Sequence, residues 1–348
     1  MHGFAANEVP VQVFRGLPPA ADAHVALTIG NFDGVHRGHR AMLSRLVEAA
    51  EDLGLPSAVL TFDPPPREFF AKASAPPRLS SVRDKIEAFA AHGVARTYVA
   101  RFDARLASLD PQSFIDGVLL SRLGVRWVLV GEDFRFGKGR AGDIATLRAA
   151  AKTFSVEAMR TVAIEGERAS STAVRAALAA GDLVRAKALL GRGFTIRGRV
   201  GHGAKLGRTL GFPTANIPLK RKPAVAGIFA VRVHGVGDMS GATLTGVASV
   251  GVRPTVAAEP VPVLEVFIFD FDAPIYGRRI GVEFMHKLRD EERYPDLAAL
   301  IRQIGDDVAQ ARHYFNTAGN SMAANQTADS AASRMNAPRM SDQQEQPA

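Results

Sequence analysis

The sequence predicts two domains: an α/β domain built on a doubly wound parallel sheet, then a six-stranded antiparallel β-barrel with a C-terminal helix. In the first half, short apolar runs at residues 25–29, 57–62, 94–99 and 126–130 alternate with segments of helical periodicity, which is typical of a parallel sheet. After residue 191, short strands separated by glycines and prolines follow one another, which favours a small barrel.

The domain limits follow from this change of pattern. At 348 residues the chain is long enough for two hydrophobic cores. We expect an α/β domain over residues 10–190 and a barrel domain over residues 191–316, closed by an amphipathic helix at 296–314. Residues 317–348 have no aromatic residue and no apolar period, so we expect a disordered tail.

The composition limits the classes of partner. The chain has 43 Lys and Arg against 35 Asp and Glu, a net charge of +8, which suits anionic partners. It has no cysteine, which excludes disulfides and cysteine metal sites and fits a reducing cytoplasm. We see no signal-peptide pattern and no apolar run of roughly 18 residues, so we expect a cytoplasmic protein without a membrane partner.

The basic residues lie mostly inside glycine-rich loops rather than along one amphipathic face. We therefore expect small-molecule substrates and no nucleic-acid partner. The alternative, a basic nucleic-acid-binding protein that uses the same fold, predicts tight and salt-sensitive binding to DNA or RNA.

The segment GNFDGVHRGH, residues 30–39, lies between a predicted strand and a predicted helix, where open α/β sheets bind ligands. Its glycines, Gly30 and Gly38 among them, allow the backbone to approach a bound group. His36 and His39 can face the same phosphate and donate hydrogen bonds to it. Two alternatives are a glycine-rich turn with half-exposed histidines and a zinc site, which would need further ligands.

Aromatic residues mark a place for a planar ring in the first half. The glycine-rich loop at residues 131–143 follows a predicted strand, and Phe134 could stack on such a ring while basic neighbours face phosphate. Phe62 ends another strand on the same side of the sheet. The alternatives are a surface loop and a core aromatic residue.

A second anion site is predicted at residues 168–175, RASSTAVR. Ser171 and Thr172 lie at the start of a predicted helix, with Arg168 and Arg175 on either side. The alternative is an ordinary N-cap cluster with solvated arginines.

In the second half, residues 201–216 combine glycines with cationic and oxygen-bearing side chains. Lys205 and Arg208 suit phosphate binding. On extended backbone Thr214 and Asn216 point the same way, so their oxygens could bind Mg²⁺ and orient a nucleotide. The alternative is a turn held by side-chain hydrogen bonds.

Glu265 is the candidate general base. In a strand at 263–270 it shares a face with Val263, Phe267 and Phe269. A carboxylate among apolar neighbours needs a partner or has a raised pKa, and both outcomes suit a base that takes a hydroxyl proton. Alternatively this face is in solvent and Glu265 has no catalytic role.

These motifs resemble those of a known family. GNFDGVHRGH is similar to the HxGH signature of nucleotidyltransferases, in the form found in bacterial bifunctional riboflavin kinase/FMN adenylyltransferases, the prokaryotic FAD synthetases. RASSTAVR resembles the family's RxSSTxIR, and RVGHGAKLGRTLGFPTANI resembles its riboflavin kinase signature with the PTAN element. The resemblance covers roughly residues 10–316.

The resemblance implies a Rossmann-like nucleotidyltransferase domain and a riboflavin kinase barrel. The barrel would phosphorylate riboflavin to FMN with ATP and Mg²⁺, and the first domain would adenylylate FMN to FAD with release of pyrophosphate. The flavins riboflavin, FMN and FAD are then substrates and products, and the chain is expected to be a monomer or a weak homo-oligomer. The alternative is an FMN adenylyltransferase with a degenerate barrel.

The residue patterns and the resemblance together give the expected site residues. The catalytic residues are His36, His39 and Glu265. The nucleotide and phosphate contacts are Gly30, Asn31, Gly38, Arg168, Ser171, Thr172, Arg175, Gly201, Lys205, Gly207, Arg208, Thr214 and Asn216. The flavin contacts are Phe62, Asp133, Phe134 and Arg289, and the metal ligands are Thr214 and Asn216.

Overall fold

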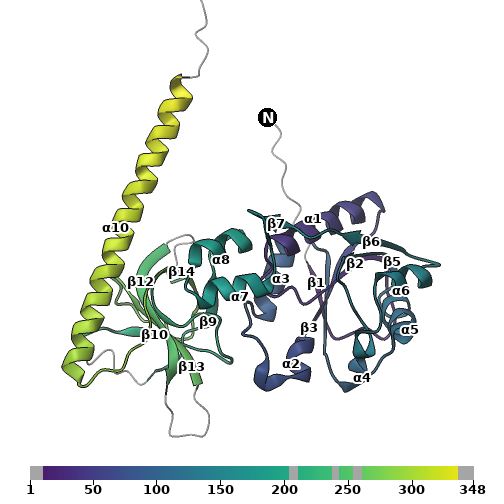
Figure 1. Cartoon of the computed structure of the whole chain (residues 1–348), viewed down its shortest axis with the longest axis horizontal. Helices are drawn as coiled ribbons and strands as arrows, with labels where there is room; N and C mark the ends of the chain where they lie inside the picture. Colours follow the sequence, from purple (N-terminus) through teal and green to yellow (C-terminus); the bar gives the residue numbers. More distant parts are fainter. Residues whose placement is uncertain (1–10, 204–210, 237–242, 254–260, 336–348) are drawn as a thin grey trace, which may run out of the picture.

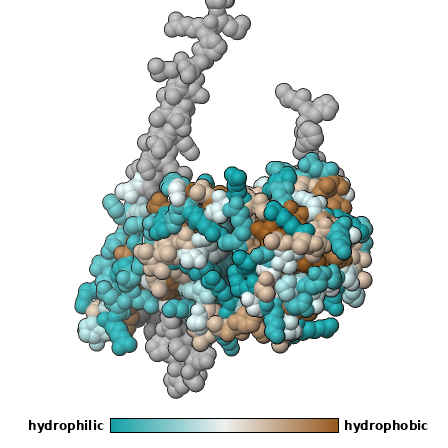
Figure 2. Space-filling model, turned by 45° about the vertical axis from the view of Figure 1, so that its right-hand side comes forward, coloured by the Kyte–Doolittle hydropathy of each residue, from teal (hydrophilic) through white to brown (hydrophobic). Residues whose placement is uncertain are grey.

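The structure, a computed structural model, describes residues 11–203, 211–236, 243–253 and 261–335. Its parts are an α/β unit, drawn in purple to teal, and a barrel, drawn in green, with helices α7 (Ser171–Ala179) and α8 (Leu183–Leu190) next to each other between them (Figure 1). The face shown in Figure 2 is largely hydrophilic, with hydrophobic residues in smaller areas. Within the described ranges, no helix is both long and apolar enough to span a bilayer.

The first domain contains a six-stranded parallel sheet in the order β1-β4-β3-β2-β5-β6. Its strands are β1 Gln12–Arg15, β2 Val25–Ile29, β3 Ser57–Phe62, β4 Arg96–Ala100, β5 Val125–Gly131 and β6 Ser155–Met159. Its helices are α1 Arg37–Asp52, α2 Pro66–Phe70, α3 Val82–Ala90, α4 Ala104–Ala107, α5 Pro111–Phe114 and α6 Ile144–Ala150. Shorter elements are η1 Lys72–Ser74, η2 Ile115–Leu120, η3 Lys138–Arg140 and the hairpin of β7 Ala163–Ile164 with β8 Glu167–Arg168.

The sheet confirms the doubly wound α/β prediction and shows where its switch point lies. The four predicted apolar runs are the central strands, and β2 pairs with β3 on one side and with β5 on the other. The chain therefore reverses direction across the sheet between these pairs, and the loops after β2 and β5 open at the same edge. The edge strands β1 and β6 were not predicted, because their half-exposed residues lack a long apolar run.

The second domain is a nearly closed antiparallel barrel, as predicted, with the strand order β10-β13-β12-β11-β14-β9. Its strands are β9 Thr195–Arg199, β10 Thr214–Pro218, β11 Gly227–His234, β12 Thr243–Arg253, β13 Val261–Ile268 and β14 Arg279–Arg289. A single bridge between Gly201 and Asn216 joins the two ends of the sheet. Along β13, Leu264, Val266 and Ile268 are buried in the core, which turns the intervening Glu265 to the outer face.

The two helices between the domains share the barrel's core. Val174 and Leu178 of α7 and Leu190 of α8 belong to the same buried cluster as Phe229 and Val231 of the barrel. The sequence assigns α7 and α8 to the first domain, but their apolar faces pack with the second. The predicted limit at residue 190/191 therefore lies between two segments whose apolar side chains belong to one hydrophobic core.

Helix α10, Leu297–Met335, lies along the outside of the barrel and extends past it (Figure 1). Its inner face packs Ala311 with Ile228, Ala230 and Val247, which is a second apolar cluster on the outer side of the sheet. The helix is longer than predicted: it continues to residue 335, where the sequence suggested disorder from 317, and residues 336–348 lie outside the described ones. The segment is rich in alanine, which has the highest helix propensity and forms helix without an apolar period.

An ion pair holds α10 to the barrel. Arg289 at the end of β14 donates from Nε and Nη2 to the two carboxylate oxygens of Asp307, both at 2.7 Å, and from Nη1 to the carbonyl of Asp290 at 2.9 Å. The Asp307 side chain is only 5% exposed. The predicted flavin contact Arg289 is thus part of the clamp between strand and helix.

We expect Asp307→Ala to destabilise the barrel by about 3–5 kcal/mol, because it leaves the charge of Arg289 unpaired in a buried place. Urea unfolding followed by circular dichroism measures the loss. The exposed pair of Arg312 and Asp270 provides the control, and Asp270→Asn, which removes the charge but suits the φ of 54° at this position, should cost less than about 1 kcal/mol. The double variant Arg289→Met/Asp307→Leu should recover most of the stability, and equal losses in the single and double variants would contradict the clamp.

Candidate active sites

The loop between β2 and α1 has an unusual backbone. Phe32 and Val35 have φ of 49° and 40°, and Gly34 has φ of 82°. A left-handed conformation is costly for a bulky or β-branched side chain, so surrounding contacts must fix it. Phe32 is fully buried and Val35 is 1% exposed, which anchors the loop in the core below α1.

Asp33 fixes this loop to two other segments. Its buried carboxylate accepts hydrogen bonds from the backbone N–H groups of Leu79 and Ser80, at 3.0 and 3.1 Å, and from the Ser80 hydroxyl at 3.2 Å. It also pairs with Arg175 of α7 at 2.5 Å. The carbonyl of Asp33 accepts from the Ser171 hydroxyl at 2.8 Å. One residue therefore joins the signature loop to the segment before α3 and to the start of α7.

His36 is the N-cap of α1, and this contact fixes its tautomer. Its Nδ1 accepts a hydrogen bond from the backbone N–H of His39 at 3.4 Å, so the proton of the neutral ring is on Nε2. The rings of His36 and His39 stack with centroids 3.7 Å apart. The Nε2–H of His36 is thus directed as a donor while the helix backbone holds the other side of the ring.

Both imidazoles are neutral at physiological pH. Burial lowers the pKa of His36 to about 4, an effect that Asp33 partly opposes and that Arg168, Arg175 and Arg192 increase. Burial also lowers the pKa of His39 well below its usual value, with smaller contributions from His36 and Lys85. The pair can therefore donate hydrogen bonds to a phosphate without the charge of an imidazolium.

The predicted second anion site lies against this loop. A side chain at Gly38 would come within 3.2 Å of the Ala169 carbonyl, so the start of α1 and the segment 168–175 are in contact. Ser170 caps α7 by accepting from the N–H of Ala173 at 3.1 Å, and Thr172 is exposed in the first turn. The structure therefore brings the two histidines and the arginine–serine segment together, as the sequence predicts.

The two arginines of this segment have protein partners. Arg175 pairs with Asp33 and also donates to the carbonyl of Pro77 at 2.7 Å. Both contacts connect α7 to other segments of the protein. Arg168 pairs with Asp133 at 2.6 Å across the gap between β8 and the loop after β5, and both side chains are more than half exposed. A predicted phosphate ligand and a predicted flavin ligand thus lie side by side.

An aromatic group lies at the ends of β3 and β4. Phe62 packs edge-on against Phe102 with centroids 5.7 Å apart, and Phe102 also contacts Phe69 and Phe70. Phe70 is 69% exposed, which is unusual for a side chain of this size. Phe134 is half-buried and stacks on Phe136 at 5.6 Å. These rings offer planar apolar surfaces at the edge of the sheet where ligands bind.

Gly30 and Asn31, the remaining predicted residues of the first loop, form hydrogen bonds through their backbone groups. The N–H of Gly30 donates to the Leu60 carbonyl at 3.1 Å, and a side chain there would press on the Phe32 ring. Asn31 is exposed, and its carbonyl accepts from the Thr61 hydroxyl at 3.3 Å. These contacts fix the end of β2 next to the end of β3.

The barrel has a polar row across its outer face. Asn216 of β10 pairs directly with Glu265 of β13, which pairs in turn with Ser249 of β12. Side chains directly opposite on antiparallel strands lie about 4.5–5.5 Å apart, so these three form one row. Thr214 is two residues before Asn216 and accepts from the Asn216 amide at 3.4 Å. The predicted metal ligands and the predicted base are therefore neighbours.

A cavity of about 390 Å³ lies beside this row at the seam of the barrel. Thr214 and Asn216 line one side, and Phe271, Pro274 and Tyr276 are among the residues that line the other. Gly203 contributes backbone, because a side chain there would overlap Asn216. Gly201 bridges to Asn216, while the predicted phosphate ligands Lys205, Gly207 and Arg208 lie outside the described residues.

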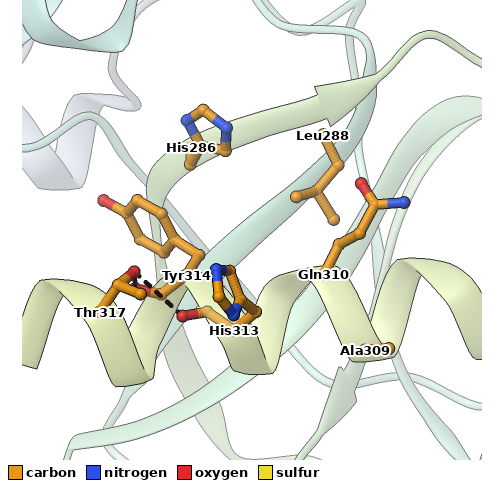
Figure 3. Close-up of a pocket in the computed structure, with 7 residues that line it drawn as sticks. All are labelled: His286, Leu288, Ala309, Gln310, His313, Tyr314 and Thr317. Carbon is orange, nitrogen blue, oxygen red and sulfur yellow. Dashed lines mark hydrogen bonds between the residues drawn. The ribbon is translucent and has the colours of Figure 1, made fainter.

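A second hollow of about 440 Å³ lies between β14 and α10 and was not predicted (Figure 3). The His286 and Tyr314 rings lie parallel on its wall with centroids 5.0 Å apart, and His313 projects from the helix beside them. In the part of the chain that the structure describes, no three histidine, aspartate or glutamate side chains are grouped as metal ligands.

Comparison with known proteins gives the family of each domain. The family model described as FAD synthetase matches residues 19–173, and the model described as riboflavin kinase matches residues 190–315. The chain is 48% identical over 307 residues to the bifunctional riboflavin kinase/FMN adenylyltransferase of Pseudomonas fluorescens, covering 87% of this chain and 97% of that protein. The chain belongs to the bifunctional riboflavin kinase/FMN adenylyltransferase family.

A second relative has the same name, and a solved structure has the same architecture. The family member from Escherichia coli K12 is 45% identical over 308 residues, which covers 88% of this chain and 97% of that protein. A crystal structure named macrolide-efflux protein from Streptococcus pneumoniae has a TM-score of 0.70 and 27% identity, covering 85% of this chain and 97% of that one. That similarity extends over both domains.

Sequence reasoning missed several residues of the first site in this family member. Asp33 lies inside the signature, but nothing in the pattern shows that its carboxylate is buried and shared by two other segments. Phe102 could have been found, because it follows the predicted strand 94–99 and, since parallel strands end at the same edge of a sheet, lies at the same edge as Phe62. Arg192, which donates hydrogen bonds to two carbonyl groups of the loop, is far away in sequence and lies in no motif.

The lowered pKa of His36 predicts how stability depends on pH. The unfolded histidine has a pKa of about 6.5, so between pH 6.5 and about 4 the unfolded state binds more protons than the folded state. Stability is therefore complete above pH 6.5 and falls as the pH decreases toward 4, by up to about 3 kcal/mol for this residue.

The variant His36→Asn keeps an N-cap acceptor and removes this titration. Its free energy of unfolding, measured by urea titration at several pH values, should fall less steeply below pH 6.5 than that of the wild type. Identical slopes for wild type and His36→Asn would show that His36 is not buried as described.

Proposed function

We propose that this protein phosphorylates riboflavin to FMN in its barrel and adenylylates FMN to FAD in its α/β domain. The observation that carries the proposal is that each domain matches its own family model and brings together the reactive side chains that its step needs. The alternative of a degenerate barrel finds no support, because Thr214, Asn216 and Glu265 are all in place.

In the kinase step, the 5′-hydroxyl of riboflavin attacks the γ-phosphorus of ATP and ADP leaves. Glu265 is half-buried in the outer row, where its carboxylate can take the hydroxyl proton as the new P–O bond forms. The adjacent cavity at the seam suits the nucleotide, because it combines aromatic and apolar walls with the oxygens of Thr214 and Asn216. Positioning and charge neutralisation then supply most of the rate.

The residues of the outer row fit a magnesium ion. Thr214 and Asn216 supply a hydroxyl and an amide oxygen, which are hard ligands of the type that Mg²⁺ takes, and substrate phosphates complete such sites. The Asn216 side chain is buried, and its amide nitrogen donates to the carbonyl and the hydroxyl of Thr214. An ion held by both side chains therefore requires the amide group to turn over, which exchanges its nitrogen and its oxygen. Bound Mg²⁺ would neutralise charge on the phosphates, while the protein fixes where they lie.

In the adenylylation step, a phosphate oxygen of FMN attacks the α-phosphorus of ATP and pyrophosphate leaves. A phosphate monoester is largely dianionic at pH 7, so the attacking group needs no general base. The Nε2–H of His36 and the N–H groups at the start of α1 would stabilise charge on the α-phosphoryl oxygens, and the N-cap contact that leaves Nε2 as the donor supports this role. Arg168 and the start of α7 would hold the leaving pyrophosphate, and the rings around Phe62 and Phe134 would hold the flavin.

Product analysis with separate substrates tests the two activities. The protein is incubated with Mg·ATP and either riboflavin or FMN, and the flavins are separated by chromatography. We expect FMN from riboflavin and FAD from FMN. The absence of FMN in the first reaction would remove the kinase claim, and the absence of FAD in the second would remove the adenylyltransferase claim.

Glu265→Gln should abolish FMN formation from riboflavin, because an amide cannot accept the hydroxyl proton. FAD formation from FMN should remain, since the residue lies on the barrel. Chromatography of both reactions measures this, and loss of both activities or of neither would contradict the assignment of the base.

His36→Asn should give the opposite result. We expect FAD formation to fall about 10²–10³-fold, the usual loss for one donor to a developing oxyanion. FMN formation from riboflavin should stay within about twofold of wild type, because the α/β domain takes no part in the kinase step. A wild-type rate of FAD formation would show that the imidazole does not contact the reacting phosphate.

A further inference from the structure

The chain segment that begins the barrel contacts the signature loop of the other domain. Arg192 follows the end of α8 and precedes β9. Its Nη2 donates to the carbonyl of Gly34 at 2.7 Å and its Nη1 to the carbonyl of Val35 at 3.2 Å. The next residue in the loop is His36, so this guanidinium binds the two peptide groups directly before the catalytic imidazole.

These two peptides belong to the strained part of the loop. Gly34 and Val35 both have positive φ, and a left-handed conformation at a non-glycine residue costs about 1–3 kcal/mol. The carboxylate of Asp33 and the Ser80 hydroxyl hold the N–H side of the loop, since Ser80 accepts from the N–H of Gly34 at 2.9 Å. Arg192 holds the carbonyl side, and this contact is made from outside the α/β domain.

Helix α1 also binds the segment that contains Arg192. Arg40 of α1 donates from Nη1 to the carbonyl of Gly191 at 3.2 Å. Gly191 has φ of 73°, and a side chain there would overlap the Arg40 guanidinium at 2.8 Å. The helix that begins at the signature loop therefore holds the residue before Arg192, while Arg192 holds the loop. Movement of the barrel's first residues would move both ends of this arrangement.

Among the described residues, Arg192 has no carboxylate at ion-pair distance. Burial lowers its pKa, Arg40 and Arg197 lower it further, and Asp84 opposes them. In the described ranges Arg192 forms no ion pair, and its two printed hydrogen bonds both go to carbonyl oxygens of the loop. A half-buried positive charge without a carboxylate partner is unusual in a structural contact and suits a place that receives anionic ligands.

We propose that Arg192 is a positioning residue for adenylyl transfer: it fixes the left-handed peptides that place the His36 donor, so the first residues of the kinase barrel complete the adenylyltransferase site. The inference rests on the proposed function of the α/β domain. It implies that the adenylyltransferase depends on the attached barrel for its geometry, whereas the kinase site, which lies on the outer row of the barrel, does not depend on Arg192.

The test compares full-length variants in both reactions. Arg192→Ala should lower kcat for FAD formation from FMN by about 10–100-fold, as expected for a displaced catalytic group, with KM for ATP changed by less than about threefold. FMN formation from riboflavin should stay within about twofold of wild type. Arg192→Lys keeps a donor within reach of the carbonyls and should recover part of the loss.

Arg45→Ala provides the matched control. Arg45 also lies on α1 and donates two hydrogen bonds, to Glu157 at 2.8 and 2.9 Å, but it does not contact the loop. Its removal should leave both rates unchanged. A loss in Arg45→Ala equal to that in Arg192→Ala would show that any weakening of α1 impairs the site, and this would overturn the proposal.

A readout that does not depend on turnover completes the test. The nitrogen shifts of His36 in an isotope-labelled protein, assigned with His36→Asn, report its tautomer and its pKa. In Arg192→Ala we expect a mixture of tautomers, because the ring would no longer be held against the N–H of His39, and loss of the Arg192 charge alone would not produce that mixture. Wild-type shifts together with a wild-type rate would overturn the proposal. If the wild type makes no FAD, the proposed function fails. If the wild type makes FAD and Arg192→Ala makes it at the same rate, only the positioning role fails.

Discussion

The adenylyltransferase half of this protein depends on one buried carboxylate. Asp33 accepts hydrogen bonds from backbone and side-chain groups before α3, pairs with Arg175 of α7, and lies in a loop that would be costly to form alone. Removing such a group would leave several donors unsatisfied in a place that water does not reach. The histidines are therefore held by the arrangement of three distant segments, while α1 contributes His39 and the backbone N–H that binds the His36 ring.

The chain uses its two sheets in different ways. The parallel sheet carries the predicted site residues at one edge, where β2, β3 and β5 end and the loops of the switch point meet. The barrel instead uses its side: alternate residues of β10, β13 and β12 fill the interior, and the residues between them form the polar row on the outside. Helix α10 covers the neighbouring part of that outer face with apolar residues, which leaves the row beside it as the polar part.

Much of this was readable in the sequence. The central strands could be predicted because strands buried on both faces of a parallel sheet have continuous apolar runs. The loop at 30–39 could be predicted because its glycines and histidines lie between a predicted strand and a predicted helix. The edge strands β1 and β6 escaped because half-exposed strands carry a weak pattern. The roles of Asp33 and Arg192 escaped for another reason: their partners are 46 and 157 residues away, and a pattern along the chain does not encode a contact across it. Arg175 and Arg289, expected as ligands, have carboxylate partners that only the fold reveals.

The hydrophobic cluster shared by α7, α8 and the barrel interior bears on how this protein could evolve. A gene divided near codon 190 would encode two polypeptides, and the helices on one product would lose the apolar surface that covers them. Each product would need new polar residues on that surface before it could remain in solution as a monomer. The union of two enzymes in one polypeptide is therefore difficult to reverse by simple gene fission, whatever advantage first brought them together.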